Sequence, residues 1–144
     1  MISYQHTQPG SAFFWPLFVC SLIAAASALI SPTARIGIIV AVPLALTLWL
    51  FGKLTITIDD KNLRAAFGPG LVYKEVPLAQ IESCLPVRIK WWEGWGIHLS
   101  RFGWLYNVSG WDAVVIRLCD GRQFAVGTDQ PHELVAAIRK QIAT

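Results

Sequence analysis

The chain has 144 residues, of which 54% are hydrophobic and 15% are charged, whereas folded soluble domains usually carry about 25% charged residues. The charges are unevenly placed: residues 1–52 contain only Arg35, and residues 53–144 hold the other 11 basic and all 9 acidic side chains. This pattern excludes a disordered chain and a disulfide-rich secreted scaffold. It also excludes a large multi-domain enzyme, because the polar part is one small domain at most.

The apolar part contains two uncharged runs, residues 12–30 and 36–51, separated by a break at Ser31-Pro32. As helices they would be roughly 28 Å and 24 Å long, against a bilayer core of about 30 Å. The runs predict a transmembrane helical hairpin over residues 12–52, after an N-terminal tail of residues 1–11. A buried hairpin would need a larger covering partner. A signal peptide is disfavoured because residues 1–11 contain no Lys or Arg.

Basic residues predict the orientation of that hairpin. The loop between the runs carries Arg35 alone, whereas Lys53, Lys61 and Arg64 follow the second run closely. Because cytoplasmic flanks are enriched in Lys and Arg, the pattern predicts a multi-pass protein of the inner (plasma) membrane. Its tail and C-terminal domain would be cytoplasmic, and the lipid bilayer would be its first partner.

The polar part, residues 53–144, is predicted to form a β domain. Short segments of alternating or β-branched composition predict about seven antiparallel strands, over residues 54–58, 63–67, 71–76, 81–90, 95–100, 113–118 and 122–126. Asp120-Gly121 is a strong hairpin signal. A C-terminal amphipathic helix follows, with Leu134, Val135 and Ile138 on one face. The order of elements predicts a small barrel or sandwich closed by this helix.

Five motifs resemble the membrane-anchored bacterial PH-like domain proteins, a family with two transmembrane helices and a PH-like barrel. They are FGPG (67–70), PLAQIES (77–83), WWEGWGI (91–97), GWLYNVSGWDAV (103–114) and DGRQFAVGTDQPHEL (120–134). The resemblance covers residues 54–142. His98 departs from the basic residue that the family pattern leads us to expect. The resemblance implies a PH-like fold but no common activity.

Aromatic side chains are concentrated between residues 91 and 111, namely Trp91, Trp92, Trp95, Phe102, Trp104, Tyr106 and Trp111. One interpretation is a domain end closed by large rings. The other is an exposed contact, because adjacent Trp91 and Trp92 of an extended segment would point to opposite faces. Basic residues flank the cluster and could meet anionic lipid, or could be ordinary solvated charges. The candidate interaction or membrane-surface residues are therefore Trp91, Trp92, Trp95, Arg88, Lys90 and Arg101.

No catalytic, cofactor-binding or metal-binding motif is recognisable in the sequence. His98, His132 and Glu133 lack zinc-ligand spacing, and His98 near Glu93 is the one place where an enzymatic group could be sought. The small positive excess of residues 53–144 disfavours nucleic acid. We therefore expect a non-enzymatic scaffold that presents its β domain for protein–protein or self association at the membrane surface. The alternative is sensing of a lipid head group or small ligand by the β domain.

Overall fold

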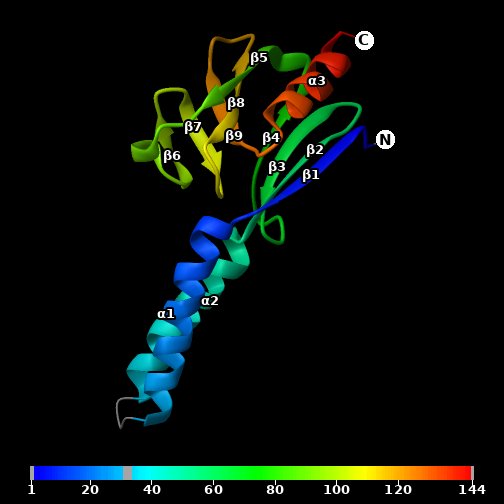
Figure 1. The fold of residues 1–144 in the computed structure, drawn as a ribbon. Coiled ribbons are helices and arrows are strands. Elements are labelled where there is room, and N and C mark those ends of the chain that lie inside the picture. Colours follow the sequence, from blue (N-terminus) through cyan, green and yellow to red (C-terminus); the bar gives the residue numbers. More distant parts are fainter. Residues whose placement is uncertain (1, 31–33, 144) are drawn as a thin grey trace.

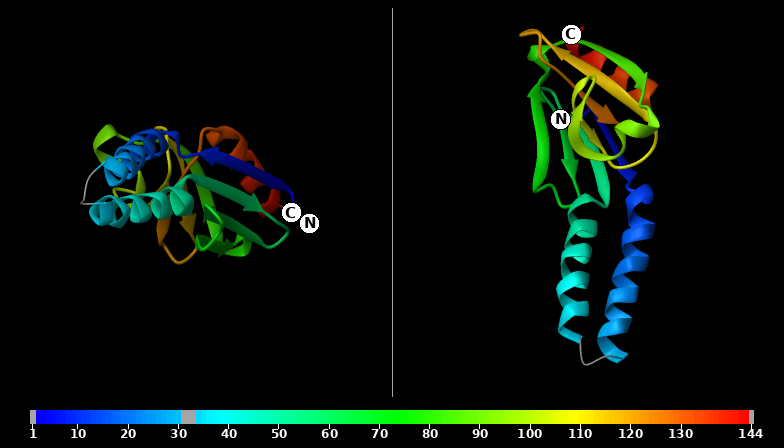
Figure 2. Two further views of the ribbon diagram at one scale, coloured as in Figure 1. Left: turned by 90° about the horizontal axis from the view of Figure 1, so that it is seen from below. Right: turned by 90° about the vertical axis from the view of Figure 1, so that its left-hand side faces the viewer.

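The computed structural model describes residues 2–30 and 34–143, apart from the side chains of residues 12–14, 28 and 34. Two helices, α1 (Ser11–Ile30) and α2 (Ala34–Phe51), lie side by side and project from a β module (Figures 1 and 2). Gly37 is buried and Ala24 and Ala41 are half-buried in this hairpin, as expected where small residues let two helices approach closely.

The prediction of two transmembrane helices is wrong. α2 has 18 residues and carries Arg35 in its first turn, so it is about 27 Å long, short of a bilayer core of about 30 Å. Among the described residues, no helix combines the length and the apolar character that crossing a membrane requires. The predicted multi-pass inner-membrane localisation and the predicted orientation depended on those spans, so they are wrong as well.

The first sheet contains β1 (Tyr4–Pro9), β2 (Lys53–Ile58), β3 (Asn62–Phe67) and β4 (Val72–Pro77), in that order and all antiparallel. Residues 4–9 of the expected tail thus form a strand. β1 precedes the hairpin and β2 follows it, and the pairing Pro9↔Lys53 closes the hairpin at its base. The Gly10 amide donates to the Gly52 carbonyl at 2.8 Å just beyond this pair.

The second sheet has the order β5-β8-β9-β7-β6. Its strands are β5 (Ile81–Arg88), β6 (Gly96–Ser100), β7 (Gly103–Asn107), β8 (Asp112–Leu118) and β9 (Gln123–Gly127). β7 and β9 are parallel, and the other neighbouring pairs are antiparallel. The hairpin between β8 and β9 turns at Asp120-Gly121, where the Asp120 carboxylate accepts from the Arg122 amide at 2.9 Å.

The main core lies between the two sheets and α3 (Pro131–Ile142), which packs on β5 and β8. On β2 the alternation of Leu54, Ile56 and Ile58 points three completely buried side chains inward. α3 contributes Leu134, Val135 and Ile138. Buried side chains of both sheets and of α3 therefore belong to a single core cluster.

The prediction of about seven antiparallel strands closed into a PH-like domain is also wrong. The described residues form nine strands in two sheets, one of which is mixed, and no ladder joins β4 to β5. The two strands are separated by a 3₁₀ turn, η1 (Leu78–Gln80). The Leu78 amide donates to the Lys61 carbonyl, and the Cys119 amide donates to the Gln80 carbonyl. This turn redirects the chain, so β5 pairs with β8 and leaves β4 as an edge strand.

Candidate functional site

The segment of residues 89–95 connects β5 to β6, which are the two opposite edges of the second sheet. Ile89 is buried against Leu105, Ala113 and Ala125, which form a small second core on the outer side of that sheet. The connection therefore crosses over the sheet rather than projecting from it. It contains a 3₁₀ turn, η2 (Trp91–Glu93).

Arg101 and Glu93 hold this crossover in place. The Arg101 side chain donates from Nη2 to the Arg88 carbonyl at 2.9 Å, and its Nε lies 3.2 Å from Glu93 Oε1. Glu93 Oε2 accepts from the Lys90 amide at 2.8 Å. Of the predicted basic residues, Arg101 thus has a structural role. Arg88 and Lys90 are exposed, and the Lys90 ammonium lies 4.8 Å from the centre of the Trp92 ring.

The predicted aromatic cluster divides into exposed and packed members. Trp91 and Trp92 are 75% and 62% exposed and meet edge to face with ring centres 5.9 Å apart. Trp95 is half-buried, lies 5.3 Å from the Trp111 ring and donates from Nε1 to the Gly110 carbonyl at 3.2 Å. The structure brings Trp91 and Trp92 together with Lys90 at the surface and places Trp95 in a separate packed pair.

The position considered for enzymatic chemistry does not assemble into a site. Glu93 engages Arg101 and the Lys90 amide, and His98 Nε2 is buried without a hydrogen-bond partner in the described chain. The described residues contain no group of three or more His, Cys, Asp or Glu side chains that could hold a metal ion.

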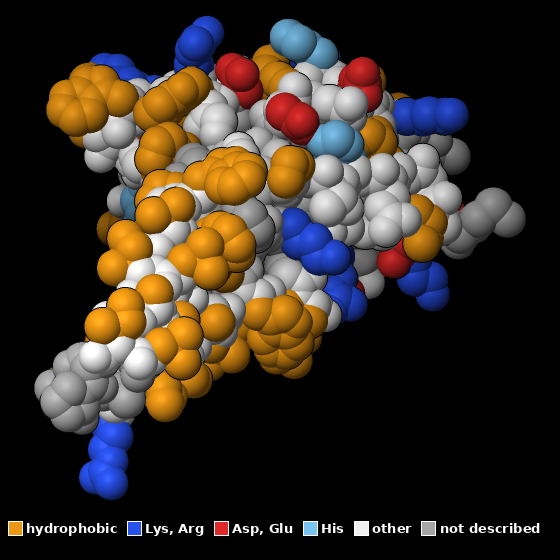
Figure 3. All heavy atoms as spheres, turned by 60° about the horizontal axis from the view of Figure 1, so that its bottom comes forward, with side chains coloured by type: hydrophobic (Ala, Val, Ile, Leu, Met, Phe, Trp, Pro, Cys, Tyr) orange, Lys and Arg blue, Asp and Glu red, His pale blue; other side chains and the backbone are white. Residues whose placement is uncertain are grey.

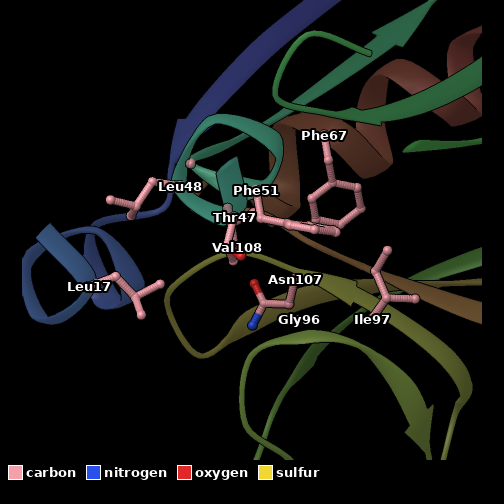
Figure 4. A pocket seen from close by; sticks show the side chains of 10 residues that line it. Leu17, Thr47, Leu48, Phe51, Phe67, Gly96, Ile97, Asn107 and Val108 are labelled. Carbon is pink, nitrogen blue, oxygen red and sulfur yellow. The ribbon is translucent and has the colours of Figure 1, made fainter. Parts of the chain in front are cut away.

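A pocket that the sequence did not indicate lies where the hairpin meets both sheets (Figure 4). We call it the junction pocket. Its volume is about 390 Å³ and it is partly open to solvent. It is lined by Leu17, Thr47, Leu48, Phe51, Gly52, Phe67, Gly96, Ile97, Asn107 and Val108. These residues come from five elements and two connections, so no local sequence pattern could have revealed it.

A network of polar contacts holds the base of the hairpin against the loop between β7 and β8. Gln8 is buried and donates from Nε2 to the Ser109 carbonyl at 2.8 Å and to Ser109 Oγ at 3.1 Å. Ser109 Oγ in turn donates to the Pro9 carbonyl at 2.8 Å. Asn107 is completely buried and donates from Nδ2 to the Gly110 carbonyl at 3.4 Å. These contacts set the wall of the junction pocket that the second sheet supplies.

Glycine is required where the turn after β3 meets the end of α2. Gly68 has φ +48°, a left-handed conformation that side chains disfavour. A Cβ there would lie 2.4 Å from the carbonyl oxygens of both Trp49 and Leu50. The close approach places Phe67, the residue before this turn, against Phe51 with ring centres 5.6 Å apart. Both rings line the junction pocket.

Comparison with family models, curated proteins and solved structures found no match to this chain. The resemblance to membrane-anchored PH-like proteins is therefore corrected: no family model supports it, the described helices do not span a membrane, and the sheets do not close into a barrel. In the structure the five motifs cover turns, the 3₁₀ turns η1 and η2, the whole of β7 and β9 and the start of α3.

Proposed function

We propose that this protein is a non-enzymatic association module whose helical hairpin packs against the hairpin of a second copy. The observation that carries the proposal is the amount of apolar surface on α1 and α2. Figure 3 shows hydrophobic side chains along the hairpin. Large apolar surfaces of this kind are typical of interaction sites.

One stripe on α2 has the spacing of an interface. Ile39, Val42, Leu46 and Trp49 follow one another at intervals of three or four residues, and they are 69%, 60%, 51% and 58% exposed. Residues at this spacing lie on one side of a helix. Leu22 and Ile23 of α1 are also more than half exposed. The hairpin therefore carries a regular apolar stripe on α2 and further exposed apolar side chains on α1.

A second copy is the occupant that fits this face. Arg35 is the only charged residue before Lys53, so a partner would need a surface that is equally apolar and uncharged, which a second hairpin supplies. Two hairpins related by a two-fold axis would form a four-helix bundle, a common arrangement in homodimers. The contact would be self-complementary without charge pairing.

The apolar surface is large enough to support a dimer. Covering a half-exposed Leu, Ile or Val removes surface worth roughly 1 kcal/mol. Five such side chains from each copy would then contribute roughly 10 kcal/mol. This exceeds the lower part of the roughly 4–15 kcal/mol range that association costs in lost freedom, and the net gain left over is small enough for the dimer to be reversible.

The test is the mass of the full chain in solution without detergent, measured by sedimentation velocity. We expect the wild type to be a dimer and Ile39→Glu/Leu46→Glu to be a monomer. Leu71→Glu is the matched control, because Leu71 is 67% exposed but lies in the turn between β3 and β4. It should keep the dimer. A monomeric wild type, or a dimer that survives the α2 substitutions, would refute the proposal.

Two further experiments distinguish the hairpin interface from the tryptophan contact and the membrane contact predicted from the sequence. Trp91→Ala/Trp92→Ala should leave the dimer intact, because these residues lie on the crossover of the second sheet. Loss of the dimer in this variant would move the interface to the tryptophan pair and overturn the hairpin proposal. In a flotation assay with phosphatidylcholine vesicles, the wild type should stay with the unbound fraction. Flotation as a monomer would identify lipid as the occupant of the hairpin face instead.

A further inference from the structure

We propose that the junction pocket binds a small uncharged molecule made mainly of hydrocarbon, such as one alkyl chain or one aromatic ring. The proposal concerns a different surface from the dimer face and does not rest on self-association. Six of the ten lining residues are apolar and large, namely Leu17, Leu48, Phe51, Phe67, Ile97 and Val108, and none of the ten is charged.

The size of the pocket suits a small molecule. Its volume of about 390 Å³ lies within the range of roughly 300–1,000 Å³ that ligand pockets occupy. Because the pocket is partly open to solvent, an apolar ligand would displace water from apolar walls, and that displacement is favourable. A ligand in this pocket would regain the van der Waals contacts that the lining otherwise lacks.

The few polar groups at the pocket decide which ligands are excluded. Thr47 Oγ already donates to the Pro43 carbonyl at 2.8 Å, so only its lone pairs are left to accept a hydrogen bond. The Asn107 side chain is completely buried, and its Oδ1 is not accessible. A carboxylate or phosphate would lose its hydration without gaining a charge partner. The pocket therefore selects against lipid head groups and for uncharged apolar molecules.

The position of the pocket gives binding a structural consequence. The lining joins α1 through Leu17, α2 through Phe51, the first sheet through Phe67 and the second sheet through Ile97. Figure 4 shows these side chains converging from separate elements. A bound molecule would contact the hairpin and both sheets at once. Because it binds only when these parts are assembled, it should stabilise the folded chain.

The probe for the test is N-phenyl-1-naphthylamine, which is uncharged and fluoresces in apolar surroundings, titrated into the full chain without detergent. We expect saturable binding of one probe per chain, at least tenfold weaker in both Leu17→Trp and Ile97→Trp, which fill the pocket from opposite walls. Leu29→Trp is the matched control, because Leu29 is 89% exposed on the same helix, does not line the pocket and is not one of the side chains assigned to the dimer face. It should bind like the wild type.

Competition and melting complete the experiment. Decanol should displace the probe from the wild type and raise the melting temperature of the wild type, but it should not raise the melting temperature of either filled variant. Decanoate at the same concentration should neither displace the probe nor raise the melting temperature. Equal probe binding by the wild type and both filled variants would show that the dye binds only to the hairpin surface and would overturn the proposal. Equal competition by decanoate would overturn the stated selectivity. Near-UV circular dichroism establishes that each variant is folded, and the milder Leu17→Phe replaces any variant that is not.

Discussion

Replacing Gly127 by Ala should destabilise the fold through one defined contact. Gly127 is the last residue of β9 and is buried. A Cβ at this position would lie 2.0 Å from Oδ1, 2.6 Å from Cγ and 2.9 Å from Cβ of Asn107. Asn107 is completely buried and is bonded to the Gly110 carbonyl, so its amide has little room to move aside. The substitution must either displace that amide or separate β7 from β9.

The expected cost is roughly 2–4 kcal/mol. Overpacking a buried site by one carbon costs roughly 1–3 kcal/mol, and losing the amide hydrogen bond adds about 1 kcal/mol. Gly127 does not have a positive φ, so backbone strain is not part of this cost. The measurement is the free energy of unfolding in urea, by circular dichroism.

A second substitution isolates the contact. Asn107→Gly removes all three clashing atoms, so Gly127→Ala in that background should cost less than about 0.5 kcal/mol, a strong departure from additivity. The control is Gly121→Ala, because Gly121 has φ +85° and no atom within 4 Å of an added Cβ. It should cost about 1 kcal/mol, because a side chain disfavours this left-handed conformation, with or without Asn107→Gly. An unchanged cost for Gly127→Ala in the two backgrounds would refute the reasoning.

Three other predictions concern burial and ionisation. Phe67→Ala should lower the free energy of unfolding in urea by about 3–5 kcal/mol, because Phe67 is completely buried. Trp91→Ala, at a 75% exposed site, should change it by less than about 0.5 kcal/mol. Similar costs for the two substitutions would contradict the observed burial. Burial raises the pKa of the Cys84 thiol, so iodoacetamide followed by mass spectrometry should label the exposed Cys119 well before Cys84, and equal rates would be inconsistent with this core. Backbone amides of its own turn lower the pKa of Asp59. The stabilisation by Asp59 is therefore complete at a pH above the ordinary aspartate pKa of about 3.9 and is lost as the pH falls through the lower pKa of the folded state. An Asp59 pKa at or above about 3.9, measured by NMR titration of its carboxyl group, would contradict the turn.

Several local features could be predicted because neighbouring residues alone decide them. The alternation of Leu54, Ile56 and Ile58 correctly marks a strand with one buried face. The spacing of Leu134 and Ile138 correctly marks the buried face of the C-terminal helix. In each case the side-chain period matches the backbone geometry of one element, and burial of that face follows whichever partner covers it.

Other features escaped prediction because they depend on pairing between distant segments. Residues 4–9 show no apolar alternation, yet they form β1, since β2 offers an open edge at the base of the hairpin. The parallel pairing of β7 with β9 also cannot be inferred from strand patterns. The exposure of Trp91 and Trp92 depends on a crossover pinned by Arg101, so composition alone left core and surface open as alternatives.

By itself the sequence determined where the apolar and polar segments lie and that residues 1–52 carry almost no charge. It also indicated most of the extended and helical segments, but not β1 or β7. The tertiary structure decided that two sheets form instead of one closed barrel, that the tryptophans divide between surface and packing, and that a pocket exists. The physical reason is the distance along the chain over which the deciding interactions act. Secondary structure follows from hydrogen bonds and side-chain periods within a few residues, whereas the junction pocket needs Leu17, Phe51, Phe67 and Ile97 to meet, and only the packing of the whole chain brings them together.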